Sequence, residues 1–217
     1  MKNLVLLVLG LVLSAVSFAQ PVEVFQRDIH LPRQKVLEYQ LIAIPALADA
    51  DLLLDGQATS LSVTTVTSFL ALIDVCRALA VLPAGTTADV KAGNVVVTGT
   101  NIYGATISEN FAFVDNASSA TNGVKAFCTV TSVVFPVQDG TGAVYDVGTQ
   151  DKLGVRKCAA NAGALAWSTF NGAFETTRGV LTADADEVEK NLFDPQGTLD
   201  GAKNVEIFFV QNYGCYP

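Results

Sequence analysis

The sequence predicts an all-β fold: an antiparallel β-sandwich or a jelly-roll-like domain, with an extended N-terminal arm. Half of the 217 residues are hydrophobic and only 16% are charged, a composition that can fill a packed core and argues against disorder. Val, Thr and Phe are frequent, and these residues fit the pleated surface of a sheet. Short apolar segments recur about every ten residues between glycine-containing turns, which is typical of sandwiches.

Residues 1–19 have the features of a secretory signal peptide. Lys2 precedes the apolar run Leu4–Val16, and small residues within Ser17–Ala19 stand where a signal peptidase requires them before Gln20. An uncleaved anchor and a misassigned start codon are the alternatives. A genuine signal predicts a secreted or extracellular protein, and no further membrane segment is expected after its removal.

Residues 20–57 are predicted to form the arm. Val22–Arg33 has an extended pattern, and Ala46–Gly56 is expected to form a short helix that ends at Gly56. The apolar residues between Val36 and Ile44 have no evident partner pattern within the chain. Because exchange of such an element between protomers is a common route to assembly, we expect the arm to contact a neighbouring subunit.

Residues 58–217 are predicted to form the sandwich as one compact domain. The strand pattern is clearest at Ala105–Val114, where Ile107, Glu109, Phe111 and Phe113 share one face. Other strands are expected at Ser60–Leu70, Asn94–Thr100, Ala126–Phe135, Ala143–Val147, Val188–Leu192 and Val205–Gln211, with a polar loop at Asp115–Gly123 and a strand pair within Asn161–Phe174.

The four cysteines are Cys76, Cys128, Cys158 and Cys215. An even number of cysteines behind an export signal favours two disulfides, and their wide spacing does not resemble a zinc site. The loop-like or terminal positions of Cys158 and Cys215 favour a bridge between those two. The other pairings, four separate buried thiols and a cross-link between subunits are open alternatives.

The charge distribution argues against nucleic-acid binding. The formal net charge is -8, and no cluster of Lys or Arg occurs in the chain. A protein that holds a nucleic-acid backbone needs a basic surface to displace counterions. We therefore expect partners other than nucleic acids.

No catalytic or metal-ligating group stands out. His30 is the single histidine, no nucleophile motif accompanies it, and a surface or interface role is expected for it. Glu109 is expected to pair with Lys125 or Lys152 or to face a subunit boundary, because no second acid is placed opposite it for glycosidase chemistry.

Two acidic sets are candidate cation sites, and the spacing of the first does not fit a calcium loop. Asp49, Asp51 and Asp55 form the first, which is expected to favour a helix N-terminus. The second contains Asp184, Asp186, Glu187 and Glu189 and is expected to be a solvated loop or strand edge. The aromatic residues Trp167, Tyr103, Tyr145, Tyr213 and Tyr216 are expected mainly to pack in the core, with a sugar-binding face as the alternative.

Four segments resemble a group of β-rich structural proteins of the virions of tailed phages and prophages. They are DVCRALAV (Asp74–Val81), GNVVVTGTNIYGATISENFAF (Gly93–Phe113), GVKAFCTVTSVVFPVQDGTGAVYDVGTQDKLGV (Gly123–Val155) and VEKNLFDPQGTLDGAKNVEIFFV (Val188–Val210). The sequence departs from the family pattern at Cys76, where proline is expected, and at Cys128, where a polar residue is expected. The leader is a third departure, because tailed-phage virions assemble in the cytoplasm.

The resemblance implies a role in particle architecture, such as head decoration, a fibre or the tail surface. We therefore expect a non-enzymatic structural subunit without cofactors, located in a virion and bound to copies of itself or to other virion subunits. A secreted, disulfide-stabilised β-sandwich that binds carbohydrate or a cell surface is the alternative.

Overall fold

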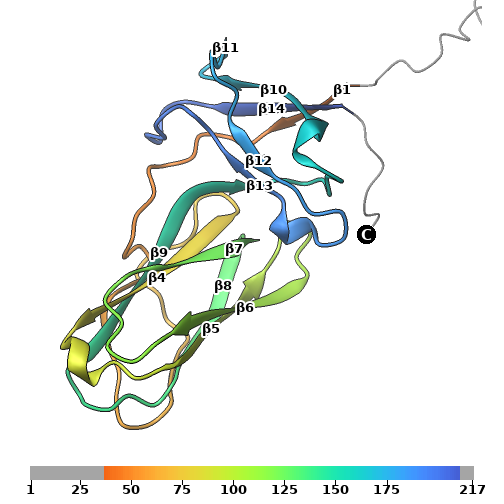
Figure 1. The fold of residues 1–217 in the computed structure, drawn as a ribbon. Helices are drawn as coiled ribbons and strands as arrows, with labels where there is room; N and C mark the ends of the chain where they lie inside the picture. The colour runs from red at the N-terminus through yellow and green to blue at the C-terminus, as the bar shows by residue number, and fades with distance from the viewer. Residues whose placement is uncertain (1–36, 211–217) are drawn as a thin grey trace, which may run out of the picture. The chain divides into compact units, whose positions relative to one another are not determined.

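The computed structural model describes residues 37–210, which form an all-β fold of antiparallel strands with three short 3-10 helices (Figure 1). This confirms the predicted fold class. The signal-peptide prediction and residues 20–36 of the predicted arm lie outside the described residues, as do His30, Tyr213, Cys215 and Tyr216.

The sandwich consists of two facing sheets. The first has the strand order β3 (Thr64–Val66), β8 (Thr129–Phe135), β5 (Gly93–Thr100) and β6 (Thr106–Phe113). The second contains β7 (Thr121–Phe127), β4 (Arg77–Gly85) and β9 (Ala143–Gly154), and β2 (Leu54–Ala58) pairs with the first half of β9. The 3-10 helix Thr87–Asp89 lies between β4 and β5.

Alternation of apolar residues explains how the two sheets form one core. In β6, Ile107, Glu109, Phe111 and Phe113 are buried while the residues between them are exposed, which confirms the predicted face. Side chains of a strand point alternately to the two faces of a sheet, so this pattern fixes which face is covered. The core also contains Val95, Val97, Val133 and Phe135 from the first sheet and Leu79, Val81, Tyr145 and Val147 from the second.

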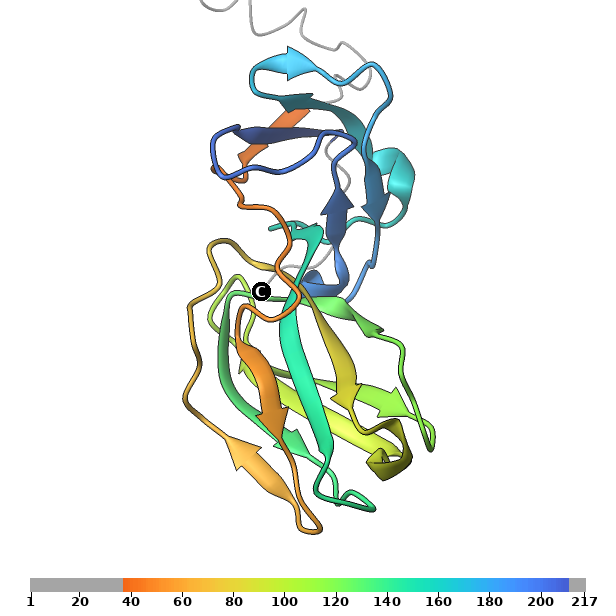
Figure 2. The same cartoon turned by 90° about the vertical axis from the view of Figure 1, so that its left-hand side faces the viewer.

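The chain builds a second hydrophobic cluster beyond the sandwich. The last two residues of β9 pair with β13 (Leu192–Asp194), which pairs with β12 (Val180–Thr182). A third sheet has the order β1 (Leu37–Leu41), β14 (Val205–Val210), β10 (Leu165–Phe170) and β11 (Ala173–Phe174) (Figures 1 and 2). One face of this sheet, with Leu165, Val205, Ile207 and Phe209, packs in the second cluster. The 3-10 helices Ala162–Ala164 and Val188–Lys190 precede β10 and β13.

Several predicted strand boundaries are wrong. The predicted strand Ser60–Leu70 is reduced to β3, and Ala126–Phe135 is divided at Cys128, where the chain passes from one sheet to the other. Val188–Leu192 begins with a 3-10 helix, because Asp184 and Asn191 bind its backbone from both sides. The periodicity of apolar residues in the sequence indicates neither where a strand passes from one sheet to another nor where a side-chain cap ends it.

The predicted helix at Ala46–Gly56 is also wrong. The segment runs through a turn at residues 50 and 51 into β2, and the backbone N–H groups of Ala46, Ala48 and Asp49 bind the side chains of Asp74, Asp151 and Thr149. Gly56 lies inside β2 with a φ of 57°, a left-handed conformation that glycine adopts readily. Residues 37–41 and 54–58 of the predicted arm belong to β1 and β2 and pair within the sheets.

Cys76 and Cys128 form a disulfide. Arg77 pairs with Phe127 in the antiparallel register of β4 and β7, so the residues just outside this pair are brought together. The predicted Cys158–Cys215 bridge involves Cys215 and lies outside the described residues. Cys158 itself is buried, and no described cysteine is a free thiol.

Candidate interaction surfaces

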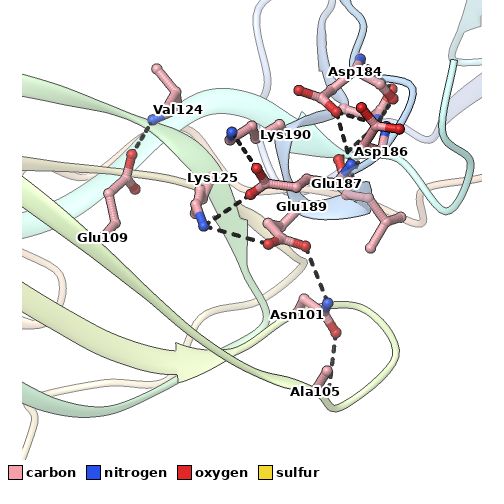
Figure 3. A network of polar contacts seen from close by, with 12 residues as sticks. Asn101, Ala105, Glu109, Val124, Lys125, Asp184, Asp186, Glu187, Glu189 and Lys190 are labelled. Carbon is pink, nitrogen blue, oxygen red and sulfur yellow. Dashed lines mark hydrogen bonds and ion pairs between the residues drawn. The ribbon is translucent and has the colours of Figure 1, made fainter. Parts of the chain in front are cut away.

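The second acidic set forms a capped turn and not a cation site. One carboxylate oxygen of Asp184 accepts the backbone N–H groups of Glu187 and Asp186 at 2.8 and 2.9 Å, and these bonds lower the pKa of Asp184. Lys125 of β7 lies 3.2 Å from Glu187 and 3.5 Å from Glu189 (Figure 3). The carboxylates of Glu187 and Glu189 thus hold the turn against the sandwich through Lys125 of β7. Among the described residues, no three or more His, Cys, Asp or Glu side chains are grouped so that they could hold a metal ion.

Glu109 forms an ion pair with neither of the expected partners, Lys125 and Lys152, and Lys125 pairs with Glu187 and Glu189 instead (Figure 3). Its Oε1 accepts the backbone N–H of Val124 at 2.6 Å, whereas its Oε2 is buried without a hydrogen-bond partner. Burial raises the pKa of Glu109, against the opposing effect of the backbone N–H groups of Val124 and Lys125. The carboxylates of Glu187 and Glu189 bind Lys125 in the same network, and no hydrogen bond or ion pair joins either of them to Glu109 (Figure 3).

The first acidic set is used locally. The Asp49 carboxylate accepts the backbone N–H of Asp51 at 3.3 Å, and Asp49 also binds Thr149 of β9 through its own backbone. Because no helix is present here, the expectation that these acids favour a helix N-terminus is wrong.

The aromatic residues named from the sequence have different positions. Tyr145 is fully buried in the sandwich core, as expected for a packing residue. Tyr103 lies in the turn between β5 and β6, and its hydroxyl donates to the carbonyl of Arg156. Trp167 lies on the face of the third sheet that is opposite the second cluster, next to Phe208. The structure therefore separates Tyr103, Tyr145 and Trp167, and among these three described residues Trp167 is the one that lies in a row of aromatic rings.

A first exposed hydrophobic surface lies along residues 59–73, which we call the edge segment. Leu61, Val63, Leu70 and Leu72 are between 60% and 89% exposed. The segment contains β3, which pairs with β8 on one side and has no strand partner on its other side among the described residues. In Figure 2 the segment runs along the left side of the sandwich.

The edge segment is fixed in place by its other side chains. Val66, Phe69 and Ile73 pack against the sandwich core, and the backbone N–H of Leu70 binds the carbonyl of Leu53 at 3.0 Å. These contacts hold the backbone of the edge segment against the sandwich, while its leucine side chains at positions 61, 70 and 72 remain exposed.

A second exposed surface is the outer face of the third sheet, which we call the aromatic face. Tyr39, Phe208 and Trp167 stand in one row across β1, β14 and β10, since Phe208 is the register partner of both other residues. The ring centroids of Tyr39 and Phe208 are 5.3 Å apart, those of Phe208 and Trp167 5.1 Å, and those of Trp167 and Phe174 6.3 Å. Tyr39 and Phe174, at the two ends, are 53% and 70% exposed.

A polar row runs beside these rings. Glu206 lies opposite Leu41 on one side and Thr169 on the other. Its carboxylate accepts hydrogen bonds from the Thr169 hydroxyl at 2.6 Å, the Asn204 amide at 3.1 Å and the Tyr39 hydroxyl at 3.3 Å. The aromatic face therefore combines exposed rings with a carboxylate whose position is fixed.

Comparisons of the chain with protein families, curated proteins and solved structures found no match. Among the described residues, no helix is long and apolar enough to cross a membrane.

Sequence reasoning did not single out the exposed residues of the edge segment or the aromatic residues beside Trp167. A signal was present for the edge segment, since no Asp, Glu, Lys or Arg occurs from Gly56 to Ile73. The row of Tyr39, Phe208 and Trp167 depends on strand order and register, which the sequence does not reveal.

Proposed function

We propose that this protein is a non-enzymatic structural subunit of a phage or phage-like particle that acts through contacts between subunits. The sequence resemblance described above supports the particle type. The edge segment is the observation that carries the proposal, because it combines an unpaired strand edge with exposed leucine and valine side chains. Its partner is a second copy of the chain or another virion subunit.

An unpaired strand edge that is flanked by exposed leucine and valine side chains is unusual on a protein that remains alone. Edge strands are commonly protected by charges, proline or a covering element, since their free N–H and C=O groups can pair with another chain. The edge segment contains neither a charged residue nor a proline. Exposed apolar patches of this kind mark interaction sites.

The absence of charge favours a second copy as the occupant. The chain has a net charge of -8, so two copies repel each other over most of their surface. The uncharged stretch Gly56–Ile73 is a place where two identical surfaces meet without this repulsion. Contacts between identical patches are the rule in two-fold symmetric assemblies.

The test is a pair of aspartate substitutions in the edge segment. Leu70→Asp with Leu72→Asp places charges on the contact surface without removing a core side chain, so we expect loss of oligomers with little change in the thermal midpoint. The matched control is Val114→Asp with Val180→Asp, which charges two exposed valines elsewhere. Unchanged oligomers in the edge variant, measured by light scattering, would refute the edge segment as the subunit contact.

A secreted binding module is the second candidate. The aromatic face and the Cys76–Cys128 disulfide favour it, because exposed rings are common in binding sites and disulfides are typical of exported domains. A monomer that is retained on glycans would favour this function over the structural subunit.

A further inference from the structure

We infer that the aromatic face of the third sheet is a binding site for a neutral polysaccharide. The site consists of Tyr39, Trp167, Phe174 and Phe208, with Glu206 and Thr169 beside them. It is separate from the edge segment and goes beyond the proposed structural function.

The two rows match the two kinds of surface of a sugar ring. A pyranose has C–H groups on its faces, which pack on aromatic rings, and hydroxyl groups at its rim, which need hydrogen-bond partners. On the aromatic face, exposed rings at Tyr39 and Phe174 lie within one or two strands of the Glu206 carboxylate. A carboxylate has about four acceptor positions, so Glu206 keeps one of them for a sugar hydroxyl beyond the three bonds that fix it.

Two hollows lie beside the ends of the ring row, and residues from both faces of the third sheet line them, since Phe209 and Phe170 pack against the second cluster. Tyr39 borders a hollow of about 320 Å³, which is also lined by Glu38, Arg156 and Lys157. Phe174 borders a hollow of about 450 Å³, which is also lined by Glu175, Thr176 and Gln196. The aromatic face itself carries four rings in a row, with neighbouring centroids 5.1 to 6.3 Å apart, so a chain of several sugar units fits it better than a single unit does.

The charge of the face favours a neutral ligand. Glu206 is an anion at the centre of the face, and the whole chain is acidic, so anionic polymers are repelled. A protein partner would bury this carboxylate among apolar groups, whereas the centres of protein interfaces are depleted of charge. A neutral polysaccharide satisfies the carboxylate through its hydroxyl groups.

Trp167 is the single tryptophan of the chain and therefore reports on this site alone. We would titrate the purified protein with hexasaccharides of β-glucan, α-glucan, chitin, mannan and xylan, and follow tryptophan emission. An oligogalacturonate of the same length is the anionic comparison. We expect a saturable change with at least one neutral hexasaccharide and none with oligogalacturonate.

The variant Tyr39→Ala with Phe174→Ala removes the two exposed rings and keeps the Trp167 reporter. We expect its dissociation constant to rise about tenfold or more, as the loss of two ring contacts implies. The control Leu61→Ala with Leu72→Ala, in the edge segment, should bind as the wild type does. Near-ultraviolet circular dichroism checks that both variants fold.

Three outcomes would overturn the inference. They are an unchanged emission with every neutral hexasaccharide at millimolar concentration, equal binding by the ring variant and the wild type, and an emission change that depends on protein concentration alone. An emission change that depends on protein concentration alone would mean that the aromatic face contacts a second copy of the chain. Oligomers that depend on the edge segment would persist in each case, so the proposed structural function is tested separately.

Discussion

At the scale of single residues, the described part of the chain holds two buried polar groups with an atom that lacks a partner. Arg77 is almost fully buried; it donates to the carbonyl of Ala46 and lies 3.5 Å from Asp74, but its Nε has no partner. Glu109 is buried with its Oε2 unpaired. Such groups reduce stability unless they are neutralised, so they are the places where a substitution can stabilise the fold.

Glu109 supplies a prediction with a defined pH dependence. Burial raises the pKa of Glu109 in the folded state above its ordinary value of about 4.3. The folded state therefore binds the proton more tightly than the unfolded chain does. This contribution to stability is fully present below the ordinary pKa and is lost as the pH rises through the folded-state pKa. We expect Glu109→Gln to be more stable than the wild type at pH 7, by about 1 kcal/mol, and the difference to shrink toward pH 4. Urea unfolding at both pH values measures this.

Glu187→Gln is the control of opposite sign. The hydrogen bond from Lys190, followed by that from Lys125, lowers the pKa of Glu187 in the folded state. The ionised carboxylate of Glu187 therefore contributes to the stability of the fold above its ordinary pKa, and this contribution is lost as the pH falls through the folded-state pKa. This variant should be slightly less stable at pH 7, because the group is exposed and well screened. A Glu109→Gln variant that is less stable than the wild type at pH 7 would contradict the account of Glu109.

At the scale of elements, the alternation of apolar and polar residues predicts a strand well when the whole strand belongs to one sheet and packs against one core. β6 has the predicted face residue by residue, and β5 differs from its predicted range by one residue. The prediction fails where one apolar run serves two sheets, as at Cys128 between β7 and β8. It also fails at β2 and at Val188–Lys190, where side-chain caps and contacts with distant strands decide the backbone. Such contacts depend on the tertiary structure and leave no periodic signal.

The Cys76–Cys128 bridge ties the start of β4 to the junction of β7 and β8, across 52 residues of sequence. Closing a loop of this length restricts the unfolded chain, which corresponds to about 2–4 kcal/mol of stability. We expect Cys76→Ala with Cys128→Ala to lower the free energy of unfolding by this amount while circular dichroism still reports the β fold. An unchanged urea midpoint would contradict a stabilising role of the bridge.

At the scale of the whole molecule, the sequence predicted the fold class but not the surfaces. Leu61 and Leu70 lie in a stretch for which the sequence predicts one long strand, and the uncharged run Gly56–Ile73 marks this segment without indicating which of its side chains are exposed. The aromatic face joins β1, β14, β10 and β11, which come from both ends of the described chain. Trp167 was named as a possible sugar contact, yet its neighbours Tyr39 and Phe208 become evident only from the strand order.

The central claim is that this protein works by assembling with copies of itself or with other subunits of a particle. Size-exclusion chromatography with light scattering, followed by negative-stain microscopy, tests it on protein expressed without residues 1–19. We predict defined oligomers, rings or filaments whose mass is a multiple of the single chain. A clean monomer at high concentration, also after mixing with the other proteins of its particle, would contradict the claim.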